Sequence, residues 1–256
     1  MAQECKRLNI PVVCITIDSN SPLANLSDIV INKLCGSEES FIETRTHMAS
    51  LLITFLCIIE TAKQKELIRR QQYTYYQQYF TRLEDNVKQI IKGRADWYKN
   101  HRELLHTKMV ARYIGAGPYY AVAQEGGLKI AEAASIAALA YEQEEFMHTG
   151  TTQIQKDALL FLIAPDGVQE KRMLELIRWC RLYSDYVILI ANHSHPLKDS
   201  KALLCHFQDD PYCSVMEYMV PFQMLAHLLA EDRGLSVVHA ANDGASAYLK
   251  THTEEV

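Results

Sequence analysis

Unbroken apolar segments alternate with longer, partly polar segments in the second half of the chain, and this alternation restricts the fold more than any other feature. Two of the apolar segments are Leu159–Ile163 and Val187–Ile190. Strands buried on both faces of a parallel sheet have this continuous apolar composition. The pattern predicts strands at 109–114, 158–164, 186–192 and 202–207, and helices at 118–135, 168–184 and 214–232. We therefore expect an α/β fold, with a parallel sheet between two layers of helices.

The first third of the chain has fewer strands. Residues 10–18 are β-branched and apolar, which predicts a fully buried parallel strand, and residues 28–34 predict a second. A long amphipathic helix is expected from about 41 to 66. Because two parallel strands rarely make an independent sheet, this region is expected to be a truncated domain.

Residues 67–107 are polar and helical in pattern, which predicts one or two connecting helices. They contain a tyrosine cluster, which is interpreted as a packing surface for a neighbouring domain or subunit, with a binding face as the alternative. The predicted organisation is a partial domain at 1–66, a helical connector at 67–107 and a complete domain at 108–256. The cluster comprises Tyr73, Tyr75, Tyr76 and Tyr79.

Composition excludes several classes of function. The net charge of the 256 residues is −5 and no basic stripe is present, which argues against a nucleic-acid partner. The longest apolar stretch, Met48–Ile59, contains Ser50 and Thr54 and is too short to span a bilayer, so no membrane association is expected. The seven cysteines are scattered and form no CxxC motif, which favours reduced thiols and a cytoplasmic location.

The stretch 109–150 is the part that most resembles a ligand site. A predicted strand ends at a turn that contains Gly115 and Gly117, and the helix after it carries Glu125, Lys129 and Glu132 on one face. Spacing alone favours a solvated ion-pair face. However, Gly126-Gly127 in mid-helix costs stability and indicates that a strand or a ligand approaches closely. The open helix start after the glycine turn can receive an anion.

Histidines give weaker signals. His148 lies in a predicted loop, where it is either an acid–base group or an ordinary surface residue. His193, His195 and His206 have no acidic or thiol partners at ligand spacing, so no metal is expected.

The segment from Gly115 to Glu132, with Glu145–His148 after it, resembles the signature of the sugar isomerase (SIS) domain family. More closely, it resembles the second SIS domain in the isomerase half of glucosamine-fructose-6-phosphate aminotransferase and its deglycase and deaminase relatives. There the pattern reads GRGxxYxxALEGALKLKE, followed by ELKHGP. Residues 1–66 resemble the closing third of a first SIS domain, and residues 108–256 resemble the second with its C-terminal tail.

The resemblance implies a set of roles. Glu132 would be the base that moves a proton between C1 and C2 of an open-chain sugar phosphate. His148 would assist ring opening, in the family from the neighbouring subunit of a dimer, and Lys250 would contact the sugar or form an imine with it. Substrate contacts are implied for Ser21, Gly115, Gly117, Glu125 and Lys129.

The chain also departs from the family pattern. The Ser/Thr-rich phosphate loop has no counterpart, and His148-Thr149-Gly150 replaces the family's HGP. The expected function is that of an isomerase, deaminase or deglycase acting on an aminosugar or sugar phosphate as a homodimer, without a cofactor. The alternative is a non-catalytic sugar-phosphate-binding module that regulates a partner.

Overall fold

The computed structural model describes residues 1–167, 169–240 and 248–249. The chain forms two compact units, residues 1–76 and 77–256, and the boundary falls inside helix α4 (Arg70–Ile91). The expected division at residues 66 and 107 stays a prediction.

The first unit contains a two-stranded parallel sheet. Strand β1 (Val13–Thr16) pairs with β2 (Ile29–Asn32), and three helices complete the unit: α1 (Ala2–Arg7), α2 (Pro22–Leu26) and α3 (Thr44–Gln64). The prediction of a fully buried strand at residues 10–18 is wrong, because Val13 is 56% exposed and Ile10 is 50% exposed. Two strands are too few to bury each other's apolar side chains, and only Cys14 of β1 is buried.

Helix α3 is the only helix in the described part of the chain that is long and apolar enough to cross a membrane, with a mean hydropathy of 1.2. Core helices of water-soluble proteins meet the same criterion. Its Ser50 and Thr54 hydroxyls donate to backbone carbonyls one turn earlier, which satisfies them within the helix.

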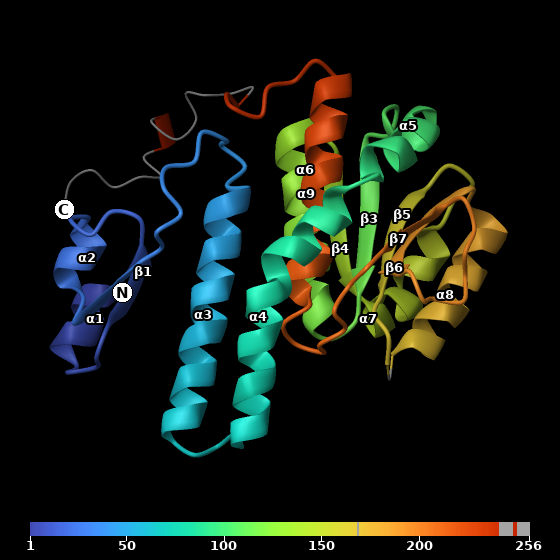
Figure 1. Cartoon of the computed structure of the whole chain (residues 1–256). Coiled ribbons are helices and arrows are strands. Elements are labelled where there is room, and N and C mark those ends of the chain that lie inside the picture. The colour runs from blue at the N-terminus through green and yellow to red at the C-terminus, as the bar shows by residue number, and fades with distance from the viewer. Residues whose placement is uncertain (168, 241–247, 250–256) are drawn as a thin grey trace. The chain divides into compact units, whose positions relative to one another are not determined.

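The second unit is built on a five-stranded parallel sheet in the order β4-β3-β5-β6-β7, which confirms the expected α/β class (Figure 1). The strands are β3 (Val110–Gly115), β4 (Ala137–Glu142), β5 (Leu159–Ala164), β6 (Tyr186–Asn192) and β7 (Ala202–Cys205). Every residue of β5 is buried, as its continuous apolar sequence predicts. In chain order this is the 2-1-3-4-5 arrangement of flavodoxin-like sheets, whose order reverses between β3 and β5.

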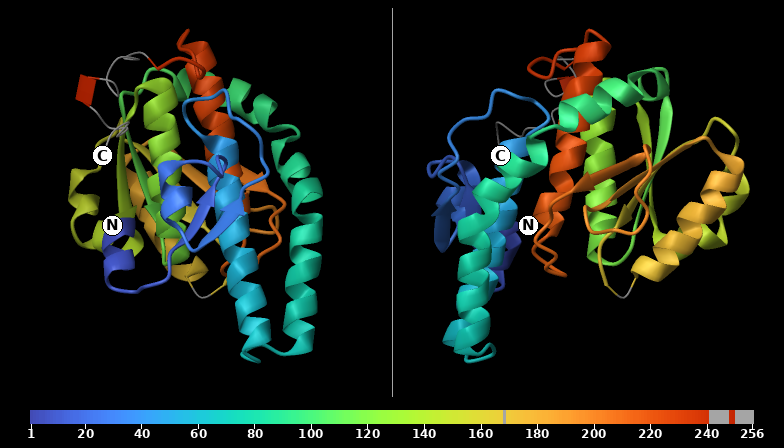
Figure 2. Two further views of the ribbon diagram at one scale, coloured as in Figure 1. Left: turned by 90° about the vertical axis from the view of Figure 1, so that its left-hand side faces the viewer. Right: turned by 45° about the vertical axis from the view of Figure 1, so that its right-hand side comes forward.

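Helices cover both faces of this sheet (Figures 1 and 2). Tyr113 and Phe161 stack on one face and contact Phe222 of α9 (Val215–Asp232), beside α6 (Pro118–Ala134). On the opposite face Ile114 belongs to a core cluster with Phe146 of α7 (Gln143–His148) and with residues of α8 (Glu170–Tyr183). The side chains of neighbouring strand residues alternate between the faces, which places α6 and α9 on one side and α7 and α8 on the other.

Helices α4 and α5 (Arg94–Leu105) precede the sheet, as the helical pattern of residues 67–107 predicts. Tyr79 is fully buried, and its hydroxyl donates to Glu217 Oε2 of α9 at 2.9 Å. Glu217 also accepts from the Gln208 backbone N–H at 3.0 Å. Burial, together with the Glu217 charge, raises the pKa of Tyr79. Tyr79 therefore packs within the second unit, and the interpretation of the cluster as a surface for a neighbouring domain or subunit stays a prediction.

Candidate active site

Lys129 lies between two carboxylates on the outer part of α6. Its Nζ is 3.2 Å from Glu125 Oε1 and 3.1 Å from Glu132 Oε2. The predicted common face is confirmed, since residues four and three positions apart lie one above the other on a helix. Lys129 is only 5% exposed, whereas the Glu132 side chain is 33% exposed. The ammonium group therefore fixes two carboxylates, one of which stays accessible from solvent.

Such a carboxylate has the properties that a general base requires. It is held in one orientation by a charge-assisted hydrogen bond, and a substrate can reach it. The buried lysine needs these partners in any case, because an unpaired buried ammonium group is costly. The arrangement is thus compatible both with catalysis and with the solvated ion-pair face that spacing alone favours.

The two mid-helix glycines of α6 are explained by packing. A Cβ atom on Gly126 would lie 2.6 Å from the Phe222 ring of α9, and one on Gly127 would lie 3.0 Å from the Tyr113 ring of β3. The two glycines therefore allow a close approach to α6, as expected, and the groups that approach it are the aromatic side chains of Phe222 and Tyr113.

The glycine turn lies at the other end of α6. Gly115 ends β3, and a Cβ atom there would lie 2.2 Å from the Tyr119 carbonyl oxygen; Gly117 caps the helix with a φ of 53°. Helix rise places Gly117 about 22 Å from Glu132 along the axis. The structure therefore does not bring the glycine turn and Glu132 into one site, and the binding roles of Gly115 and Gly117 stay predictions.

His148 is the last residue of α7 and is exposed. The expected loop between residues 136 and 157 is wrong, because β4 and α7 occupy much of it. β4 has the sequence AALAYE, and its alanines have low strand propensity, which conceals the strand in the sequence. Because α6 and α7 cover opposite faces, the sheet separates Glu132 from His148 within one chain.

The remaining predicted residues lie elsewhere. Ser21 belongs to the first unit, where it caps α2 by accepting a hydrogen bond from the Ala24 backbone N–H at 3.3 Å. Lys250 lies outside the described residues. In the parts of the chain that the structure describes, no group of three or more histidine, cysteine, aspartate or glutamate residues can hold a metal ion.

A polar cluster at the carboxyl ends of three strands was not identified from the sequence. Asp166 follows β5 and accepts from the Ser194 hydroxyl at 3.2 Å, and Asn192 at the end of β6 donates to Asp209, which follows β7. Burial and the neighbouring Asp166 raise the pKa of Asp209 to about 6. Ligands in open α/β sheets bind at this edge. The available signal was a polar residue at or within four residues after the end of each of these strands.

Part of the chain matches a known domain, and most of the chain is similar to known aminotransferases. Residues 105–209 match the model of the SIS domain. The chain is 24% identical over 237 residues to the glutamine–fructose-6-phosphate aminotransferase (isomerizing) of Caldanaerobacter subterraneus, covering 92% of this chain and 39% of that relative. The Thermococcus kodakarensis aminotransferase is 25% identical, covering 90% of this chain and 38% of the relative. The chain thus spans about two fifths of the length of these curated relatives.

Solved structures share the fold. The C-terminal domain of glucosamine-fructose-6-phosphate aminotransferase from Francisella tularensis superposes with a TM-score of 0.85 at 21% identity, covering 92% of this chain and 67% of that one. Glucosamine-6-phosphate deaminase from Thermotoga maritima superposes with a TM-score of 0.64 at 19% identity, covering 94% and 67% of the two chains.

Proposed function

We propose that the chain acts on a phosphorylated sugar or aminosugar, because residues 105–209 match the SIS domain and because the chain is similar to glutamine–fructose-6-phosphate aminotransferases over 92% of its length. The reaction would be isomerisation, deamination or removal of an amine from a fructosamine phosphate. Similar proteins named for fructose-6-phosphate amination and for glucosamine-6-phosphate deamination support this substrate class.

The observation that carries the proposal is the fixed and accessible Glu132 carboxylate beside Lys129. In an open-chain sugar phosphate, Glu132 would remove the proton from the carbon next to the carbonyl or imine carbon. The C–H electron pair would then form the double bond of an enediol or enolamine while the carbonyl oxygen or imine nitrogen takes the displaced electron pair and a proton. The same carboxyl group would return its proton to the neighbouring carbon, and the hydroxyl on the first carbon would lose its proton and become the new carbonyl. No electrons enter or leave overall, so the chemistry needs no cofactor.

The other residues would complete the site. His148 would move a proton during ring opening and Lys250 would contact the sugar or form an imine, while Glu125 and Lys129, on the same helix face as Glu132, would bind substrate. Because the sheet lies between Glu132 and His148, the histidine of this site would come from a second copy of the chain. This favours a homodimer.

The alternative proposal is a regulatory module that binds a sugar phosphate without converting it. Two sequence observations favour it. The Ser/Thr-rich phosphate loop has no counterpart, and Thr149-Gly150 follows His148 in place of Gly-Pro.

The location that we propose is the cytoplasm. All seven cysteines are free thiols. Burial raises the pKa of Cys180 to about 12 and that of Cys205 to about 11, which keeps both thiols protonated and unreactive. Reduced thiols of this kind are typical of a reducing compartment.

The test is turnover of glucosamine-6-phosphate and fructosamine-6-phosphate by the full-length gene product. We expect Glu132→Gln to reduce kcat by about 100-fold or more, because general-base removal typically costs this much. Glu103→Gln, an exposed change on α5, is the matched control and should leave kcat unchanged. Calorimetric binding of the same sugar phosphates without turnover would select the regulatory alternative, and turnover by Glu132→Gln at the normal rate would exclude Glu132 as the base.

A further inference from the structure

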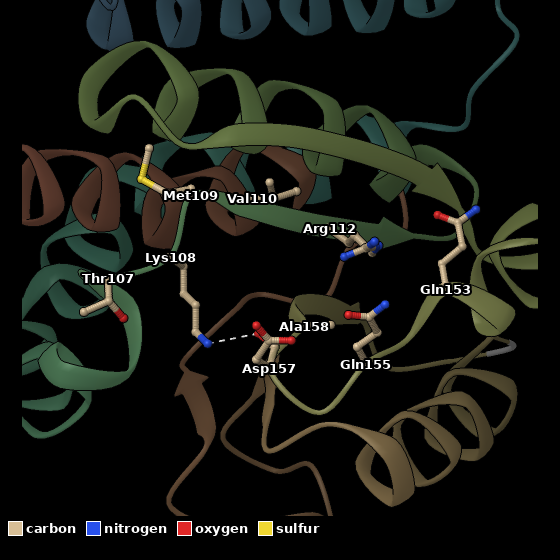
Figure 3. Close-up of a pocket in the computed structure, with 9 residues that line it drawn as sticks. All are labelled: Thr107, Lys108, Met109, Val110, Arg112, Gln153, Gln155, Asp157 and Ala158. Carbon is tan, nitrogen blue, oxygen red and sulfur yellow. Dashed lines mark hydrogen bonds between the residues drawn. The ribbon is translucent and has the colours of Figure 1, made fainter.

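A hollow of about 740 Å³ opens at the amino-terminal ends of β3 and β5, away from the carboxyl edge of the sheet. Its polar lining is rich in hydrogen-bond donors, and Figure 3 shows the Arg112 and Gln155 side chains directed into it, with Lys108 at its opposite end. The polar residues are Thr107, Lys108, Arg112, Gln153, Gln155 and Asp157.

Arg112 makes no ion pair with a carboxylate among the residues that the structure describes. It lies in the middle of β3, and its backbone pairs with β4 and β5 on either side. Its Nε is buried and unpartnered, and its guanidinium makes no hydrogen bond or ion pair with residues in the described ranges. A partly buried charge without a partner is costly. A strand arginine of this kind indicates that a negatively charged group completes its environment.

Two other charged residues, Lys108 and Asp157, line the hollow. The Lys108 ammonium donates to the Asp157 carbonyl oxygen at 2.9 Å and lies 3.3 Å from the centre of the Tyr186 ring, so both contacts hold it in place. Asp157 is the one acidic residue among those lining the hollow. Two cations and one carboxylate leave a positive balance at this site.

We propose that this hollow binds the phosphoryl group of a small molecule, with the Arg112 guanidinium as its principal contact. The planar guanidinium presents a fork of N–H donors that fits a phosphate bidentately. The Gln155 amide, at the same end of the hollow as Arg112, adds further donors from another direction (Figure 3). This number of donors suits a tetrahedral phosphate with several acceptor oxygens better than a carboxylate with two. Asp157 can accept from hydroxyl groups of the attached organic part.

This site is separate from the proposed reaction. Arg112 precedes Ile114 by two residues on β3 and therefore shares its face, the face of α7 and α8, whereas Glu132 lies on α6 at the opposite face. The inference does not rest on the sugar-phosphate activity.

The test is isothermal titration of the full chain with inorganic phosphate, at constant ionic strength set with chloride. We expect saturable binding, which Arg112→Gln weakens by about tenfold or more because a charge-assisted contact is lost. The matched control Arg178→Gln changes an exposed arginine of α8 and should bind phosphate like the unmodified chain. Acetate should bind at least about tenfold more weakly than phosphate, since it offers fewer acceptors.

Three outcomes would overturn the proposal: no saturable phosphate binding by the unmodified chain, equal binding by Arg112→Gln, or equal affinity for acetate and phosphate. If Arg112→Gln does not fold, Gln155→Ala decides, because Gln155 lies outside the helices and strands. A several-fold loss of phosphate affinity in Gln155→Ala supports the site, and unchanged affinity overturns it.

Discussion

Glu132 and His148 lie on opposite faces of the same parallel sheet, Glu132 in the last turn of α6 and His148 at the end of α7. A chain that used both residues in one reaction would therefore have to contribute them to two different sites. Each site would combine Glu132 of one copy with His148 of another.

This relationship predicts complementation between inactive variants. Glu132→Gln and His148→Ala should each be nearly inactive alone, but mixed dimers contain one site with both native residues. Random mixing of equal amounts should restore about a quarter of the native activity, because about half of the dimers are mixed and each has one working site. Turnover after co-refolding of the two variants measures this.

The control mixes Glu132→Gln with Lys129→Met, whose changes fall on the same α6 face and cannot complement each other. If the mixture of Glu132→Gln and His148→Ala is no more active than this control, the two residues do not meet across a dimer.

Gly126→Ala is expected to change the free energy of unfolding in the direction opposite to the one that helix propensity favours. Alanine at this position should favour the helix by about 1 kcal/mol. Its Cβ would, however, lie 2.6 Å from the Phe222 ring, and overpacking of this kind typically costs about 1–3 kcal/mol. We expect Gly126→Ala to lower the free energy of unfolding, as measured by urea denaturation. Adding Phe222→Leu should recover part of the loss, and a Gly126→Ala variant more stable than the native chain would contradict the packing explanation.

Asp209 predicts a pH dependence of stability. Its pKa is raised from 3.8 to about 6, so between these values the folded chain binds a proton that the unfolded chain has released. Protonated Asp209 therefore contributes to the free energy of unfolding at low pH, and this contribution is lost as the pH rises from about 4 to about 6. Asp209→Asn should remove this fall and stabilise the protein near neutral pH, by about 1 kcal/mol or less because Asp209 keeps solvent contact.

Asparagine is suitable here because it tolerates the φ of 56° at this position and can still accept a hydrogen bond from Asn192. Urea denaturation at about pH 4 and about pH 7 compares the two states of the group. Asp85→Asn, at an exposed position of α4, is the control and should not change the pH dependence. A parallel pH profile for Asp209→Asn and the native chain would show that Asp209 does not titrate in this range.

The sequence by itself determined the α/β class, most elements of the second unit and the common face of Glu125, Lys129 and Glu132, because these follow from local periodicity. It did not reveal β4, whose alanines carry little strand signal. Only the tertiary structure decided which neighbours the glycines of α6 accommodate. It alone placed Glu132 and His148 on opposite faces, gathered Asp166 and Asp209 at one edge and left the buried Arg112 Nε without a hydrogen-bond partner among the described residues. Those relationships depend on strand order and on which helix covers which face, and both are set by contacts between segments far apart in the chain.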